Sequence, residues 1–230
     1  VLGIDWGSDA VHASILTRDS PTPRSVRGTA AGHDLYAKGS FDAALYFDGP
    51  EKVHCAHETR HPDREVVPSK AFFSLRPRTR NRTVDAWLGG MEAEATWALV
   101  RLPMEAIAKA ALLGAQRFCD GFNDISSSRY RIERIGLSHP AHWGHQERTR
   151  YEELIRKLVP EALPSAASDV RISFHVESLA LAHRVLMYPR SADGFAPSPS
   201  ASVLVVLLEF GAFTMAGPRP NPHPDPRASG

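Results

Sequence analysis

The first eight residues combine an apolar strand, a carboxylate and a glycine turn. Residues 1–4 are apolar or small and precede Asp5. They predict a buried strand whose acid emerges at its carboxyl end, where open α/β sheets bind ligands. Gly7 lets the backbone turn close to a phosphate, and the Ser8 hydroxyl can donate a hydrogen bond to it. The pattern suits a metal-bound phosphate, and a plain β-hairpin is the alternative interpretation.

The elements that must hold this turn are predicted by hydrophobic periodicity. Alternating apolar residues pair residues 1–5 with 11–16 as a hairpin. Further strands are expected at residues 41–47, 52–57, 66–75, 131–138, 171–176 and 203–208. Helical spacing predicts helices at residues 103–121, 146–159 and from 177 onward, with Pro103 in a first turn and Pro160 as a stop. Strands that alternate with helices in the second half indicate an α/β fold.

Prolines, glycines and serines mark the connections between these elements. Residues 17–39 have no clear period and are expected to be a surface loop insertion, and residues 189–202 a second loop. Residues 217–230 are rich in proline and lack core-forming residues, so we expect a disordered tail there. The ordered structure is therefore expected within residues 1–216.

The composition indicates a folded protein with a sizeable core. The 230 residues are 43% hydrophobic, and interspersed acids and bases leave a net charge of +1, which argues against a nucleic-acid partner or a membrane anchor. The two cysteines, Cys55 and Cys119, have no metal or redox spacing, so we expect a reducing, cytoplasmic compartment. The longest apolar stretch, residues 203–208, is too short to cross a bilayer, and no signal-like segment opens the chain. The sequence does not begin with Met, so we expect that its N-terminus has been trimmed.

Histidines and arginines give three weaker patterns. His54, Cys55 and His57, with His61, contain soft ligands for zinc, but strand alternation sends His54 and Cys55 to opposite faces. The histidines at positions 139, 142 and 145 fit a turn and a helix start better than a metal site or a proton relay. The basic cluster at residues 76–82 favours a solvated loop, with a phosphate or RNA contact as the alternative.

Several segments, taken in order, resemble motifs of the heat-shock protein 70 family of actin-like ATPases. Residues 3–8 are similar to the family's first phosphate motif, and residues 138–148 to its valine-proline-alanine-aromatic signature with a glutamine-arginine pair. The other matching segments are residues 67–73, 87–93, 176–182 and 205–214, the last resembling the second phosphate motif. The resemblance is strongest to divergent, fungal-type members and runs from residue 1 to about residue 215.

This resemblance implies the first lobe of a ribonuclease-H-like fold that binds ATP and magnesium. Magnesium would be held through water by Asp5 and Glu209, and the attacking water would be oriented or deprotonated by Glu177. The phosphates would be contacted by Gly7, Ser8, Gly211 and Thr214. Without a ligand, Glu177 is a helix N-terminal carboxylate and Glu209 a surface-turn acid. The family also implies client proteins and co-chaperones as partners.

Departures from the family pattern argue against rapid hydrolysis. Asp9 stands where the family has a second hydroxyl, and its charge would face the phosphates. Ala212 and Phe213 replace glycines of the second phosphate motif. The family's catalytic lysine follows the leucine-glycine turn, but no lysine lies between Gly90 and Pro103. The 230 residues also contain no counterpart of the family's second lobe, adenosine-binding segment or peptide-binding domain.

Three hypotheses about function follow. The first is a truncated, degenerate chaperone-type ATPase lobe that binds nucleotide and hydrolyses it weakly or not at all. The second is a non-catalytic protein-interaction module that has kept the fold. The third is a gene-model fragment without independent activity, which the abrupt proline-rich end favours.

Overall fold

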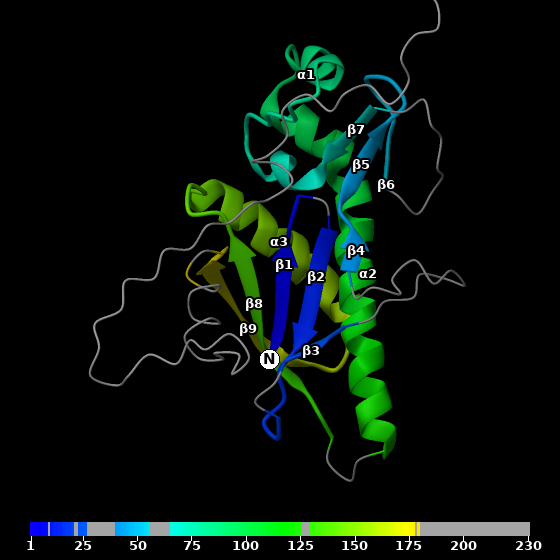
Figure 1. Ribbon diagram of the computed structural model, residues 1–230, viewed down its shortest axis with the longest axis vertical. Coiled ribbons are helices and arrows are strands. Elements are labelled where there is room, and N and C mark those ends of the chain that lie inside the picture. The colour runs from blue at the N-terminus through cyan, green and yellow to red at the C-terminus, as the bar shows by residue number, and fades with distance from the viewer. Residues whose placement is uncertain are drawn as a thin grey trace, which may run out of the picture.

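The computed structural model describes residues 1–8, 10–20, 23–26, 40–55, 65–125, 129–177 and 179 (Figure 1). In these ranges the fold is mixed α/β, as the sequence predicted, with a mixed sheet and flanking helices. Its elements are β1 (Leu2–Trp6), β2 (Ala10–Ile15), β3 (Arg24–Ser25), β4 (Ser40–Asp42), β5 (Ala44–Phe47), β6 (Val53–Cys55), β7 (Glu65–Pro68), the 3₁₀ helix η1 (Ser69–Phe73), α1 (Arg82–Leu88), α2 (Ala93–Ile125), β8 (Ile132–His139), α3 (His145–Ala162) and β9 (Ala166–Val176).

The larger of two sheets determines where strand ends meet. Its order is β3-β2-β1-β8-β9, and β4 also pairs with β2. β2 is antiparallel to β1, whereas β8 is parallel to both β1 and β9. The carboxyl ends of β1, β8 and β9 therefore lie at the same edge of the sheet. A smaller sheet, β6-β5-β7, lies beyond the β1–β2 turn (Figure 1).

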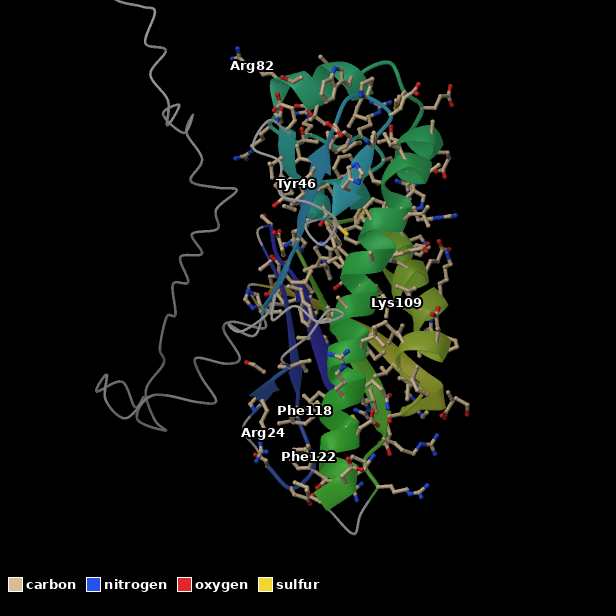
Figure 2. All side chains as sticks on the ribbon, turned by 90° about the vertical axis from the view of Figure 1, so that its right-hand side faces the viewer. Arg24, Tyr46, Arg82, Lys109, Phe118 and Phe122 are labelled. Carbon is tan, nitrogen blue, oxygen red and sulfur yellow. The ribbon has the colours of Figure 1, made fainter. Side chains whose placement is uncertain are left out.

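One face of the large sheet is covered by α2 and α3, which lie side by side (Figures 1 and 2). Leu2, Ile4 and Trp6 of β1 are at most 2% exposed and belong to the core. Because successive side chains of a strand alternate, Gly3 and Asp5 belong to the opposite face, and Asp5 is exposed. No helix among the described residues is long and apolar enough to cross a membrane.

Helix α2 is longer than the sequence predicted, because Pro103 does not start it. The helix begins at Ala93 and contains Pro103 in its interior, where the missing N–H removes one backbone hydrogen bond. Its buried stripe runs from Thr96 to Cys119, on both sides of the proline. Packing of this stripe holds the helix together across the break in hydrogen bonding. Pro160 is likewise inside α3, two residues before its end.

The predicted strand at residues 66–75 is wrong beyond Pro68, where the chain turns into η1. Phe72 and Phe73 are consecutive, and both are at most 1% exposed. A strand would point them to opposite faces, whereas a helical turn lets both enter one core. The predicted strand at residues 41–47 is also divided, between β4 in the large sheet and β5 in the small one.

Two segments expected to be loops contain regular structure. Residues 24 and 25, within the expected insertion, form β3 against β2. The basic cluster at residues 76–82 leads into α1, whose N-cap is Asn81. The Asn81 Oδ1 atom accepts hydrogen bonds from the backbone N–H groups of Thr83 and Val84, at 3.1 and 3.2 Å. The expected helix beyond residue 179, the loop at 189–202, the strand at 203–208 and the tail at 217–230 lie outside the described residues.

Candidate functional site

Two polar side chains meet where β1 and β8 end. Ile4 pairs with Leu137 in the parallel register, which brings the next residues, Asp5 and Ser138, side by side. The Ser138 hydroxyl donates a hydrogen bond of 2.5 Å to Oδ1 of Asp5. In the next strand, His175 is the register partner of Ser138. Asp5, Ser138 and His175 thus form a polar row across the sheet face opposite the helices.

Beyond Asp5, Gly7 and Ser8 form the turn from β1 to β2. The Gly7 N–H donates to the carbonyl oxygen of Ala10 at 2.9 Å. A Cβ atom at Gly7 would lie 2.7 Å from that same oxygen, so the position has no room for a side chain. This requirement for glycine comes from the hairpin itself. Asp9, which follows, lies outside the described residues.

We expect the Gly7→Ala substitution to lower the free energy of unfolding by about 1–3 kcal/mol, because the added methyl collides with backbone. Chemical denaturation would measure this loss. The matched control is Gly121→Ala in α2, where a Cβ atom meets nothing within 4 Å. The control should gain about 0.5–1 kcal/mol, since alanine favours a helix interior over glycine. A Gly7→Ala chain as stable as the unsubstituted one would mean that the turn adapts freely.

The Glu177 carboxylate directly follows β9 and forms an ion pair with Lys70. The Lys70 Nζ atom lies 2.5 Å from Oε1 of Glu177, and the two side chains are only 14% and 17% exposed. Lys70 belongs to η1, a segment that the sequence predicted as a strand. Sequence reasoning therefore missed this residue. The signal that could have found it is a lysine placed between residues that must all be buried, Val67 before it and Phe72 and Phe73 after it.

Aromatic rings beneath these polar groups join β1, η1 and α3. The Trp6 ring lies 5.1 Å from Phe73 and 5.6 Å from Tyr151, measured between centroids, in edge-to-face geometry. Phe73 and Tyr151 are 4.9 Å apart. The Trp6 indole N–H also donates a hydrogen bond of 2.8 Å to the Ser69 hydroxyl. The strand that carries Asp5 and the turn that carries Lys70 are thus held together by one buried cluster.

The Tyr151 hydroxyl is the most unusual polar group in this cluster. Tyr151 is fully buried, and its hydroxyl has no hydrogen-bond partner among the described residues. Burial raises its pKa well above the ordinary value, and the charges of Asp5 and Glu177 raise it further. We use the name strand-end site for Asp5, Ser138, Lys70, Glu177 and Tyr151.

The histidines of the sequence do not assemble into a metal centre in the described part of the chain. There, no group of three or more His, Cys, Asp or Glu side chains could hold a metal ion. His139 is buried, and its Nδ1 lies 2.8 Å from the Pro140 carbonyl oxygen while its ring stacks on Trp143. This is the turn role that the sequence favoured. Cys55 is buried in β6 beside His54, and His57 and His61 lie outside the described residues.

A concave region lies at the amino ends of β8 and β9, away from the strand-end site. It is an open hollow of about 300 Å³, lined by Arg131, Glu133, Arg134, Ala167, Asp169 and Arg171. Acids and bases alternate around it, so a phosphate there would meet carboxylates as well as guanidinium groups. It also lies near the amino ends of β8 and β9, away from the edge where α/β sheets bind ligands.

The predicted site residues divide into two groups. Asp5, Gly7, Ser8 and Glu177 are described, and Asp5 and Glu177 lie at the same edge of the sheet, at the end of β1 and directly after β9. Glu209, Gly211 and Thr214 lie outside the described residues, so the second phosphate motif stays a prediction. No protein-family model matches this chain, and a comparison with the curated proteins also finds no match. The function must therefore be argued from the strand-end site.

Proposed function

We propose that this chain is the first lobe of an actin-like ATPase of the heat-shock-70 type, and that it binds the phosphates of Mg²⁺-ATP at the strand-end site. The observation that carries this proposal is the convergence of Asp5, Ser138 and the Lys70–Glu177 pair at the carboxyl ends of three parallel strands. Phosphate binding requires cations and donors beside an acid that can hold metal-bound water, and these residue types meet that requirement.

Support for a ribonuclease-H-like lobe comes from the strand order. The sheet has the order β3-β2-β1-β8-β9. β2 is antiparallel to β1, whereas β1, β8 and β9 are parallel to one another. We propose that this sheet forms the lobe. It puts the Gly7 turn next to the end of β8, with the end of β9 one strand further along. This arrangement supports the proposal that Asp5 and Glu177 serve one site.

We further propose that nucleotide turnover is slow. No lysine lies between Gly90 and Pro103, and loss of one such stabilising donor typically costs about two to three orders of magnitude in rate. Binding with little hydrolysis is therefore the expected behaviour.

Calorimetric titration of Mg²⁺-ATP into the chain tests the binding proposal. We expect saturable heat for the unsubstituted chain and at least about a tenfold loss of affinity in Asp5→Asn, because the variant loses the charge that holds metal-bound water. The matched control is Asp120→Asn. Asp120 is an exposed acid of α2 that accepts a hydrogen bond from the Gln116 side chain. The control should bind as the unsubstituted chain does. Absence of heat, or equal affinity in Asp5→Asn, would contradict the nucleotide site.

A further inference from the structure

Lys70 is a sheltered cation at the strand-end site. Its side chain is 14% exposed and its Nζ lies 2.5 Å from Oε1 of Glu177. Removing an ammonium group from water is unfavourable, and lysine is therefore among the residues least often buried. A lysine at this place fixes a positive charge next to the ends of the parallel strands, where an anionic ligand would enter.

The backbone that carries Lys70 is firmly attached. The neighbouring Ser69 is fully buried and accepts a hydrogen bond from the Trp6 indole at 2.8 Å. Its N–H donates to the Ala43 carbonyl oxygen at 3.0 Å. These two contacts connect η1 both to β1 and to the segment between the two sheets. The ammonium group is thus presented at a defined position relative to Asp5.

A second, independent observation at the same site is the Tyr151 hydroxyl. It is completely buried, it has no hydrogen-bond partner within the described ranges, and its ring packs against Trp6, the residue that follows Asp5. Buried donors are almost always satisfied in native proteins. An unsatisfied donor in the aromatic cluster beneath Asp5 indicates a place for a buried water molecule.

We infer that Lys70 contacts the phosphates of the bound nucleotide and exchanges its Glu177 contact for a phosphate oxygen when nucleotide binds. This inference rests on the proposed function. A phosphate chain carries more negative charge than a carboxylate, so the ammonium group gains electrostatic attraction by the exchange. The cation comes from η1, since residues 91–102 contain no lysine. The same exchange releases the Glu177 carboxylate toward water.

The test compares ligand affinity in two lysine variants of the 230-residue chain. Mg²⁺-ATP and Mg²⁺-tripolyphosphate, which has phosphates without adenosine, are titrated by calorimetry. We expect Lys70→Gln to bind both about ten- to a hundredfold more weakly, the usual effect of losing a charge-assisted hydrogen bond. The matched control is Lys109→Gln, which removes another paired lysine, from α2 (Figure 2).

The control lies far from the strand-end site. The Lys109 partner is Glu161, in the last turn of α3. Sixteen residues separate Glu161 from His145 at the start of that helix, which corresponds to about 24 Å. Because α3 starts at the edge where β8 ends, its last turn lies at the opposite edge. Lys109→Gln should therefore leave both affinities unchanged.

A double variant, Lys70→Gln with Glu177→Gln, separates phosphate contact from simple charge neutralisation. It removes both charges, so neither is left sheltered and unpaired, and it keeps the comparison possible if Lys70→Gln alone does not fold. If Lys70 contacts phosphate, the double variant stays weak in binding. Restored affinity in the double variant, or unchanged affinity in Lys70→Gln, would overturn the inference alone. Failure of the unsubstituted chain to bind either ligand would overturn the proposed function as well.

Discussion

The Phe73→Ala substitution is expected to destabilise the chain by about 3–5 kcal/mol, the largest effect of any single change considered. Phe73 is fully buried, and its ring contacts those of Trp6, Trp143 and Tyr151 at centroid distances of 5.1, 5.2 and 4.9 Å. Truncation would leave a cavity at the point where β1, η1 and α3 meet. Thermal or chemical denaturation followed by circular dichroism measures the loss.

Leu102→Ala is the control for this prediction. Leu102 is an apolar residue of α2 that is 68% exposed, so its truncation removes little buried surface. We expect a change within about 0.5 kcal/mol, as for most surface positions. If Phe73→Ala were as mild as Leu102→Ala, the aromatic cluster would not hold η1 against β1, and the position of Lys70 would lose its physical basis.

The second large effect is expected at alkaline pH and comes from Tyr151. Its folded-state pKa is raised well above the ordinary value by burial and then by Asp5 and Glu177. Above about pH 10 the unfolded chain loses the phenol proton while the folded chain retains it. The unfolded state then binds fewer protons, so the free energy of unfolding falls with rising pH, by up to about 1.4 kcal/mol per pH unit from this group.

The Tyr151→Phe variant isolates this contribution. It lacks the titrating hydroxyl, so its stability should decline less steeply above about pH 10 than that of the unsubstituted chain. The pKa of the buried Cys119 thiol is also raised, and it adds a similar slope to both proteins, which the comparison cancels. At neutral pH the variant should be equally stable or more stable, because the lost hydroxyl has no partner in the described residues. Parallel curves for both proteins above pH 10 would contradict the burial of Tyr151.

The sequence predicted elements well where a single periodicity governs burial. The β1–β2 hairpin alternates with period two, and β8 and the first residues of α3 lie within one or two residues of their predicted starts. The mixed α/β class followed from these elements. Each depends on its own apolar pattern and on one face that packs against the core.

Tertiary packing decided the elements that the sequence missed. Helix propensity alone predicts that a helix starts at Pro103. Helix α2 nevertheless continues through this residue, because residues on both sides of it are buried against the same core. Phe72 and Phe73 are compatible with a strand until both must enter one core. Neither conflict can be resolved before the neighbouring elements are known.

The sequence predicted those residues of the strand-end site that lie at the ends of strands. Asp5 and Glu177 follow apolar strands, and parallel pairing through β8 brings those ends to one edge. Lys70 was not predicted, because it lies in a segment that was assigned to a strand. Tyr151 was not predicted, because its spacing is that of an apolar position on the buried face of a helix. Their relation to the two acids depends on contacts between segments far apart in the sequence, 107 residues for Lys70 and Glu177.

The most direct test of the proposed phosphate site is a crystal structure of the chain with Mg²⁺ and a non-hydrolysable ATP analogue. We predict that the phosphates lie at the carboxyl ends of β1, β8 and β9, with an oxygen within hydrogen-bond distance of Lys70 Nζ and the metal's water on Asp5. Nucleotide bound elsewhere, such as in the hollow lined by Arg131, Arg134 and Arg171, with the Lys70–Glu177 pair intact, would contradict the proposal.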